Sequence, residues 1–412
     1  MNKPELLIPA GSLEVLKTAV LFGADAVYIG GELFSLRAKA HNFTNAEMKE
    51  GIEFCHAHGK KLYVTANITA HNYHLDGVHA YFLELKEMRP DALIISDPGV
   101  FRIAREICPE IPVHISTQAN NVNSETFLFW YSLGVRRVVC GRELSLKEIT
   151  EIRKTIPDDM EIEAFVHGAM CISYSGRCLL SNYMTGRDAN LGACTHPCRW
   201  KYYLMEESRP GEYFPVEENE DGTYIFNSKD LCMISHIPDL VNAGINSFKI
   251  EGRMKTALYV AVVAGTYRKA LDDYFEGEEV YHKNLPLYED EISKCTFRNY
   301  TTGFYYGKPG SDAQVYDNNV YEKNYIYLGT VGEVTADGCV VFEQRNKFCT
   351  GDVIDVMTPG FVHTQANVLS MRNEEREEVE SCPHPKQKIT MKLDCTAKVG
   401  DILRMKSDGE DC

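Results

Sequence analysis

Residues 22–31, FGADAVYIGG, combine the end of a helix, a glycine turn and a short apolar run. The same plan returns as RPDALIISD at 89–97, LGVRRVVCG at 133–141 and AGINSFKIEG at 243–252. A glycine or proline ends each preceding helix, and the apolar run after it is typical of a strand that is buried on both faces. The repetition predicts a parallel sheet built from successive strand–helix units.

Eight strand candidates of this kind lie in the first 250 residues. They are Glu5–Ile8, Ala26–Ile29, Lys61–Ala66, Ala92–Ile95, Val113–Ser116, Arg137–Cys140, Glu161–Val166 and Ser247–Ile250. Eight parallel strands with interleaved helices predict an α/β fold, a (β/α)8 TIM-like barrel, with an open doubly wound sheet as the alternative. In a barrel, functional side chains gather at the carboxyl ends of the strands.

The helices between these strands have recognisable starts. Thr44 with Glu47, and Ser145 with Glu148, have the spacing of capping boxes. Apolar residues at helical spacing over residues 256–275 predict a long helix that follows the eighth strand.

The residue pattern of the sequence changes after about residue 280, where short runs typical of strands, such as YIYLGTVGEV and KITMKL, alternate with turns. We predict a catalytic barrel domain over 1–280, a linker over 281–320 and a small C-terminal all-β barrel domain over 321–412. About 80 residues separate the seventh and eighth strands, and they include a cysteine-rich insertion predicted over 168–232. The acidic stretch 206–222 is expected to form an exposed loop.

The composition limits the class of protein. The chain has 412 residues, a formal net charge of −16 and 14 cysteines. An acidic protein does not coat nucleic acid non-specifically, although a local basic patch is compatible with RNA binding. No apolar run approaches the roughly 20 residues that span a bilayer. The sequence therefore predicts a cytoplasmic protein without membrane contact, in which clustered cysteines bind metal and do not form disulfides.

Five cysteines are clustered in the middle of the chain: Cys171, Cys178, Cys194, Cys198 and Cys232. Their C-x6-C and C-x3-C spacings differ from the paired C-x2-C of a zinc ribbon. Clustered thiolates are ligands for soft metals, so the residues predict an iron–sulfur cluster, with structural zinc and unliganded cysteines as the alternatives.

A spaced signature surrounds the first two of these cysteines: Glu163, Phe165, Gly168-Ala169-Met170-Cys171, Gly176, Cys178 and Ser181. It closely resembles the signature of peptidase family U32, the collagenase-like peptidases of unassigned mechanism. PAGS at 9–12, GADAVYIGG at 23–31 and SFKIEGR at 247–253 are similar to other blocks of that family. The resemblance spans residues 4–255, and the C-terminal β-domain is similar to that of its tRNA uridine 5-hydroxylase branch.

The resemblance implies a cofactor, a substrate and a donor. RNA- and quinone-modifying members of the family carry a [4Fe–4S] cluster. In the quinone-modifying branch its ligands match Cys171, Cys178, Cys194 and Cys232, and Cys198 is the alternative fourth ligand because of its proximity in the sequence. The tRNA hydroxylases modify the wobble uridine in the anticodon region and take the hydroxyl group from prephenate, a small dicarboxylate. The resemblance thus implies a prephenate-dependent tRNA uridine hydroxylase.

Charged and titratable side chains near the strand ends supply the candidate site. We predict catalytic roles for His167, Arg142, Arg253 and Glu251, and donor binding by Arg177 and Lys249. An arginine fork binds a carboxylate in a bidentate manner, and histidine can act as acid or base near neutral pH. The alternative for each cation is that it pairs with a neighbouring acid such as Glu143 or Glu251.

The alternative function is a collagenase-like peptidase. Ser116, His167 and Asp97 lie near strand ends and could form a hydrolytic triad, but the chain has no His-Glu-x-x-His zinc motif. A non-catalytic assembly partner is a third possibility. For an RNA substrate, the basic residues Lys386, Lys388 and Lys392 of the β-domain are a candidate contact surface.

Overall fold

The computed structural model describes residues 2–36, 42–171, 173–174, 177–200, 203–204, 214–215, 229–309 and 322–407. The chain forms two compact units, each assembled from separate segments. The first comprises 1–11, 26–254 and 298–321, and the second comprises 12–25, 255–297 and 322–412. Within the described ranges, no helix has both the length and the apolar character needed to cross a membrane.

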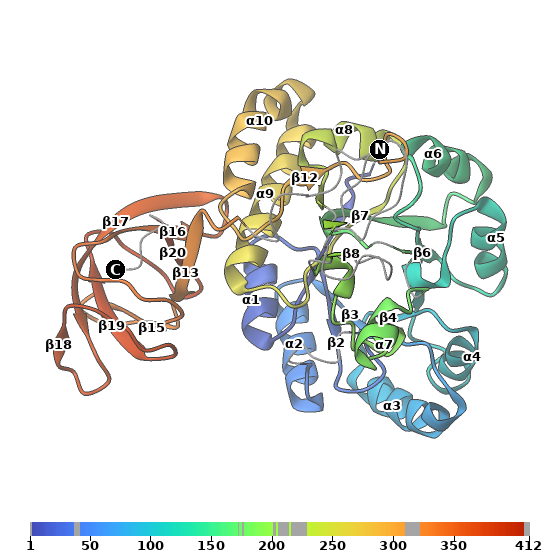
Figure 1. Cartoon of the computed structure of the whole chain (residues 1–412), viewed down its shortest axis with the longest axis horizontal. Helices are drawn as coiled ribbons and strands as arrows, with labels where there is room; N and C mark the ends of the chain where they lie inside the picture. Colours follow the sequence, from blue (N-terminus) through green and yellow to red (C-terminus); the bar gives the residue numbers. More distant parts are fainter. Residues whose placement is uncertain are drawn as a thin grey trace. The chain divides into compact units, whose positions relative to one another are not determined.

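The first unit contains a closed ring of eight parallel strands (Figure 1). These are β1 (Glu5–Pro9), β2 (Ala26–Gly30), β3 (Lys61–Ala66), β4 (Ala92–Ile95), β5 (Val113–Ile115), β6 (Arg137–Val139), β7 (Glu161–Ala169) and β11 (Ser247–Ile250). Each strand pairs with the next, and β11 closes the ring by pairing with both β1 and β7. The predicted (β/α)8 barrel is confirmed, and the open-sheet alternative is excluded because the ring has no free edge.

Helices that connect these strands belong to the same unit: α2 (Asn45–Ala57), α3 (Leu75–Met88), α4 (Pro98–Ile107), α5 (Ser124–Ser132), α6 (Leu146–Thr155) and α8 (Ile237–Asn242). Both predicted capping boxes are confirmed. At the start of α6, Ser145 Oγ accepts from the Glu148 N–H, and Glu148 Oε2 accepts from the Ser145 N–H at 2.8 Å. Thr44 and Glu47 make the equivalent pair at the start of α2.

Strand β7 is longer than predicted. It continues to Ala169 because a short strand from the insertion, β10 (Asp230–Cys232), pairs with its last residues in antiparallel fashion. This register places Cys232 opposite His167. β10 also pairs in parallel with β12 (Tyr300–Thr301). The extra strand pair supplies backbone partners that the barrel alone would not offer.

The described part of the insertion has other short elements besides β10. It includes α7 (Leu180–Thr185) and the two-stranded pair β8 (Tyr203–Leu204) and β9 (Phe214–Pro215). The predicted acidic loop 206–222 lies outside the described residues, except for β9.

The second unit combines helices with an antiparallel sheet that curves as a half-barrel. Its helices are α1 (Leu13–Leu21), α9 (Ala257–Glu276) and α10 (Glu278–Ile292). Its strands are β13 (Tyr325–Thr330), β14 (Glu333–Val334), β15 (Val340–Glu343), β16 (Val353–Thr358), β17 (Val362–Arg372), β18 (Glu378–Val379), β19 (Lys388–Leu393) and β20 (Ile402–Lys406). The predicted C-terminal all-β fold is confirmed.

Two ion-pair clusters connect helices to strands inside the second unit. Glu14 of α1 accepts from Tyr327 Oη at 2.8 Å and from Arg345 Nη2 at 3.0 Å. The fully buried Arg404 of β20 pairs with Glu291 of α10, and its Nε lies 3.2 Å from Asp355 Oδ2. Residues 281–320, which the sequence predicts to be a linker, therefore begin with a packed helix.

Candidate active site at the carboxyl end of the barrel

A pocket of about 570 Å³ opens beside the carboxyl ends of β5, β6 and β7. Its walls come from the loops after these strands, from the start of α6 and from a segment just after β12. The lining residues are Thr117, Arg142, Glu143, Ser145, Glu148, Met170, Cys171, Ser173, Tyr174, Phe304, Gly307 and Lys308. The volume lies within the range of small-molecule sites, and the position is where barrel enzymes carry their chemistry.

Arg142 is the central cation of this pocket. Its Nη2 lies 2.9 Å from Glu251 Oε2, and its Nη1 donates to the Ala169 carbonyl at 2.9 Å. The guanidinium also lies 3.8 Å from the centre of the Phe165 ring. Its Nε is buried and has no hydrogen-bond partner within the described part of the chain. Arg142 is thus held in place by an acid, a backbone carbonyl and an aromatic ring.

Glu143 presents a half-buried carboxyl group to the same pocket. Burial raises the pKa of this carboxyl, against the opposing effects of its own backbone N–H and the Arg142 charge. Arg142 forms its ion pair with Glu251, so of the two predicted acidic neighbours it is Glu251 that pairs.

Arg253 is buried next to the ends of β2 and β3. Its Nη1 donates to Ser35 Oγ at 2.6 Å and to Thr65 Oγ1 at 2.9 Å, and its Nη2 donates to the Leu36 carbonyl. A Cβ on Gly30 would lie 2.3 Å from Arg253 Nη1, so only glycine leaves room for this side chain. Arg253 thus hydrogen-bonds to groups at the ends of β2 and β3 and is not part of the pocket lining, and its catalytic role stays a prediction.

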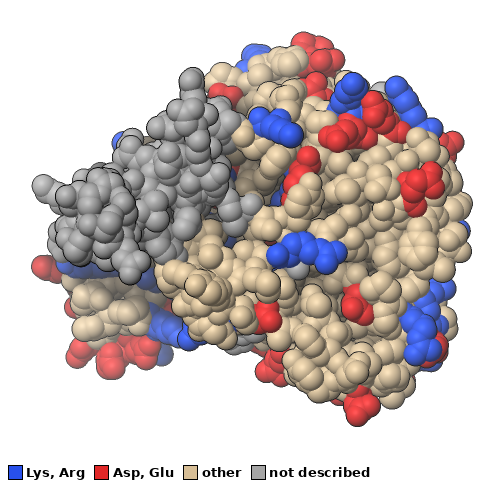
Figure 2. All heavy atoms as spheres, turned by 45° about the vertical axis from the view of Figure 1, so that its right-hand side comes forward, with Lys and Arg blue, Asp and Glu red and all other residues tan. Residues whose placement is uncertain are grey.

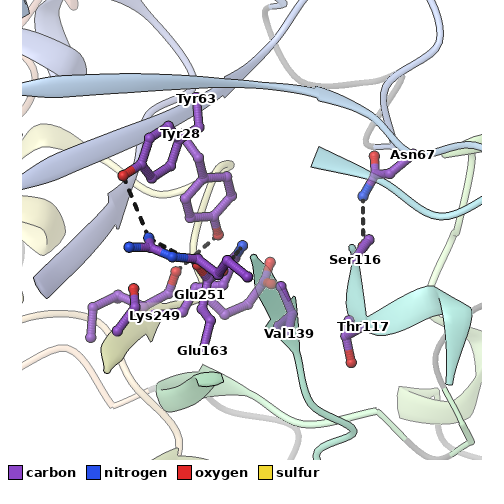
Figure 3. Close-up of polar contacts among 12 residues, drawn as sticks. Tyr28, Tyr63, Asn67, Ser116, Thr117, Val139, Glu163, Lys249 and Glu251 are labelled. Atoms are coloured by element: carbon purple, nitrogen blue, oxygen red, sulfur yellow. Dashed lines mark hydrogen bonds and ion pairs between the residues drawn. The ribbon is translucent and has the colours of Figure 1, made fainter. Parts of the chain in front are cut away.

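Lys249 lies inside the barrel and outside the pocket lining. Its Nζ is 2.6 Å from Glu163 Oε1 and 4.5 Å from the centre of the Tyr28 ring. Figure 3 shows Tyr28, Tyr63, Glu163 and Lys249 together on one side of the interior. Lys249 is therefore paired with an acid, as the alternative to donor binding predicts. Its partner is Glu163 and not Glu251.

Charged groups continue through the interior at the amino ends of the strands. Arg137 pairs with Glu5 and, at 2.6 Å, with Glu161 Oε2. Burial raises the pKa of Glu5, but the charge and hydrogen bonds of Arg137 outweigh it, so the pKa lies below the ordinary value. His114 is buried next to this group, and burial together with nearby cations lowers its pKa well below the ordinary value.

A polar cluster occupies the other side of the barrel mouth (Figure 3). Asn67 Nδ2 and Ser116 Oγ each donate to Gln118 Oε1 at 2.8 Å. Thr117 Oγ1 donates to the Cys140 carbonyl at 3.0 Å. Polar residues therefore follow the strand ends as the sequence predicts, and most of them hydrogen-bond to one another.

The remaining two predicted side chains lie apart from the pocket lining. His167 is buried in β7, with its ring centre 5.5 Å from that of Tyr300. Arg177 is exposed, and its Nε donates to Asn120 Oδ1 at 2.7 Å.

Both parts of the chain match one protein family. Residues 11–315 match the model of peptidase family U32, and residues 323–404 match the C-terminal domain of that family. The chain belongs to peptidase family U32. The resemblance predicted from the signature around Cys171 is confirmed.

Several relatives of this U32 chain have names that refer to RNA modification, whereas one from Methanocaldococcus jannaschii, 44% identical over 305 residues and covering 73% of each chain, is named an uncharacterized protease. The tRNA hydroxylation protein P1 of Bacillus subtilis is 41% identical over 404 residues, covering 98% of this chain and 95% of the relative. The tRNA hydroxylation protein P of Escherichia coli is 42% identical over 400 residues, covering 87% of each. The 23S rRNA 5-hydroxycytidine synthase of Escherichia coli is 36% identical over 277 residues, covering 67% of this chain and 40% of that protein.

The family's peptidase label does not correspond to a hydrolytic triad at Ser116 in this U32 member. The Ser116 hydroxyl is hydrogen-bonded to Gln118, and Asp97 caps α4 by accepting from the N–H groups of Gly99 and Val100. Both side chains therefore make other hydrogen bonds than the contact with a histidine that a catalytic triad requires.

The cysteines of the U32 signature differ in exposure. Cys171 is exposed and lines the pocket, whereas Cys178, Cys194, Cys198 and Cys232 are half-buried. Thiolates are suitable donors for iron or zinc. In the segments that the structure describes, however, no three His, Cys, Asp or Glu side chains converge closely enough to hold a metal. The donor chemistry of these thiols fits a cluster.

Several pocket residues are not among the sequence-predicted site residues. Tyr174 lies between two cysteines of the signature, but it carries no charge and so is not among the predicted charged or titratable residues. Glu143 enters the sequence prediction only as a partner for Arg142. Phe304 and Lys308 are more than 120 residues away from Tyr174 along the chain. No local motif marks the last two, because contacts with distant segments, such as the pairing of β12 with β10 and the Leu146 N–H to Tyr305 carbonyl hydrogen bond, bring their segment to the barrel mouth.

Proposed function

We propose that this protein is an RNA-modifying enzyme that hydroxylates the wobble uridine of transfer RNA to 5-hydroxyuridine. The observation that carries the proposal is 41% identity to a tRNA hydroxylation protein over 98% of this chain and 95% of the relative. This alignment extends across both the barrel and the C-terminal domain, so the similarity is not limited to a shared fold. A tRNA substrate would also place the protein in the cytoplasm.

The pocket has the chemical features that such a reaction needs. A prephenate-type donor carries two carboxylates, and Arg142 is a cation in the pocket lining. We propose that Arg142 binds one of these carboxylates, with Glu251 holding the guanidinium in position at 2.9 Å. A carboxylate that approached the pocket would then meet a fixed donor and would not have to order a flexible side chain.

We further propose that Cys171, Cys178, Cys194 and Cys232 hold a [4Fe–4S] cluster, with Cys198 as the alternative fourth ligand. When bound, such a cluster supplies a redox or Lewis-acid centre. Anaerobic purification followed by iron and sulfide analysis tests this proposal, and individual Cys→Ala variants identify the ligands.

The substrate proposal is tested by comparing nucleosides from cells with and without the gene. Loss of 5-hydroxyuridine from transfer RNA is the expected result. Unchanged transfer RNA with loss of a hydroxylated nucleoside from ribosomal RNA would refute the uridine assignment and retain RNA hydroxylation. Complementation with Arg142→Gln should fail to restore the modification, whereas Arg102→Gln, on the exposed surface of α4, should restore it.

The lysines of β19 are a second place where RNA contact can be tested. Lys388 lies opposite Glu343 in the sheet, and Lys392 Nζ donates to the Asp337 carbonyl. Acidic neighbours thus surround this basic group. If the group contacts RNA, neutralising Lys386, Lys388 and Lys392 together will lower tRNA affinity and flatten its salt dependence.

A further inference from the structure

Aromatic side chains form part of the pocket wall, which is an arrangement that suits a flat ring. Tyr174, from the loop after β7, is 50% exposed, and the half-buried Phe304 follows β12. The buried Met170 adds a third apolar side chain to the lining. Nucleobases bind to such aromatic surfaces because every base has a π-face that can stack.

Positive charge near the pocket comes from individual basic residues. The protein carries a formal net charge of −16, and on the face drawn in Figure 2 basic and acidic side chains lie among one another around a largely uncharged surface. RNA must therefore be attracted by individual basic residues. Lys308 is exposed, and it lies in the pocket lining four residues after Phe304.

The N-terminus of α6 also faces the pocket, but three of its N–H donors are already in use. Ser145 and Glu148 cap each other's N–H groups, and the Leu146 N–H donates to the Tyr305 carbonyl at 3.0 Å. With these three N–H groups occupied, the helix end has fewer donors for a phosphate. A phosphate at this pocket would therefore be bound by the Lys308 side chain.

Glu143 supplies a polar group for the edge of the base. Its carboxyl is half-buried in the lining, and the adjacent guanidinium of Arg142 forms its ion pair with Glu251. A carboxylate accepts hydrogen bonds. Uracil presents one N–H donor at N3, so the two groups are complementary.

We infer that the pocket is a single-nucleotide site that takes one uridine nucleotide, with the base stacked on Tyr174 and Phe304, its N3–H on Glu143 and its phosphate on Lys308. This inference deepens the proposed function and rests on it for the identity of the ligand. A loop nucleotide of RNA is already unpaired, so its base can enter such a pocket at little cost.

The test measures binding of uridine 5′-monophosphate to the full-length protein by titration calorimetry. Tyr174→Ala should weaken binding by about 5- to 150-fold, the usual value of one base–aromatic stack. Tyr174→Phe should leave affinity nearly unchanged because the ring remains. Tyr183→Ala is the matched control, since Tyr183 is 85% exposed and outside the pocket lining.

Two further comparisons separate the phosphate and base-edge contacts. Wild-type protein should bind the monophosphate more tightly than uridine by about 10-fold or more, and Lys308→Ala should remove that difference, whereas Lys147→Ala on α6 should not. Wild-type protein should discriminate against N3-methyluridine monophosphate, and Glu143→Leu should lose this discrimination.

The results distinguish this inference from the proposed function. Equal binding by wild type, Tyr174→Ala and Tyr183→Ala would overturn the single-nucleotide site, even if deletion of the gene removed 5-hydroxyuridine from transfer RNA. Conversely, Tyr174-dependent binding would support the site even if the nucleosides of transfer RNA were unchanged by the deletion. Absence of monophosphate binding by wild-type protein would also overturn the inference.

Discussion

Replacing Lys249 by methionine is expected to destabilise the barrel by about 3–5 kcal/mol. The Lys249 side chain is 5% exposed and that of Glu163 is 0% exposed, with 2.6 Å between Nζ and Oε1. At an effective dielectric constant of about 20, two unit charges at this distance attract by roughly 6 kcal/mol, which is offset in part by their desolvation. After the substitution, the nearest remaining cation for Glu163 is Arg137, whose Nη1 lies 3.6 Å from Oε2.

Tryptophan fluorescence can follow this change, because both tryptophans, Trp130 and Trp200, belong to the first unit. The expected loss corresponds to a fall in melting temperature of roughly 6–20 °C for a unit of this size. Arg102→Met is the matched control: the Arg102 side chain is 72% exposed, and its pair with Glu106 contributes at most about 0.5 kcal/mol.

The double variant Lys249→Met/Glu163→Leu sharpens the test. Removing both charges leaves no uncompensated carboxylate, so the double variant should be more stable than Lys249→Met alone. If Lys249→Met melted within a degree or so of Arg102→Met, the reasoning that the interior charges are strongly coupled would be refuted.

Three further outcomes follow from the structure. The unfolded chain protonates His114 below about pH 6.5, while the folded protein holds it neutral. The free energy of unfolding should therefore fall by up to about 1.4 kcal/mol per pH unit below that point. In urea titrations between pH 7 and pH 5, His114→Asn should show a weaker dependence of this free energy on pH. Ser145→Ala should cost about 1 kcal/mol and speed amide exchange in the first turn of α6, whereas Ser145→Thr should retain the cap; equal exchange in all three would contradict this. Gly168 has φ +108°, and an added Cβ would lie 2.5 Å from the Glu251 carbonyl oxygen. Gly168→Ala should therefore lower the melting temperature by several degrees. An unchanged melting temperature would count against this argument from backbone conformation.

Local sequence determined the barrel strands well. The predicted limits Lys61–Ala66, Ala92–Ile95 and Ser247–Ile250 agree at both ends with β3, β4 and β11. These runs are buried on both faces and bounded by glycine, proline or polar residues, so each carries its own start and stop. The capping boxes of α2 and α6 were predictable for the same reason, since both partners lie within one helical turn.

Elements that depend on distant partners were not predictable in this way. The last residues of β7 become strand only because β10 pairs with them, more than 60 residues later in the chain. Helix α10 contains Pro286 and packs through the buried Tyr281 and Tyr288, a sparse pattern that local reasoning reads as a linker. Phe304 and Lys308 reach the pocket through β12, which consists of two residues.

The candidate site shows a related limit. Lys249 and Glu251 are two residues apart, so strand alternation places both side chains on the same face. Lys249 nevertheless pairs inside the barrel with Glu163, while Glu251 reaches Arg142 at the pocket. Spacing along a strand predicts which face a side chain occupies, but depth along the barrel axis depends on the partners that the other strands supply.

The Glu163–Lys249 pair also has a consequence for how the barrel closes. The last strand of the ring, β11, joins β7 with Lys249 opposite Phe165 and Phe248 opposite Ala164. A slip of one residue would turn Lys249 outward and Phe248 inward, leaving Glu163 buried without this cation. An apolar interior would penalise such a slip only weakly, whereas the charge pair distinguishes the correct alignment from its neighbours. The pair therefore favours one register of the final strand during folding.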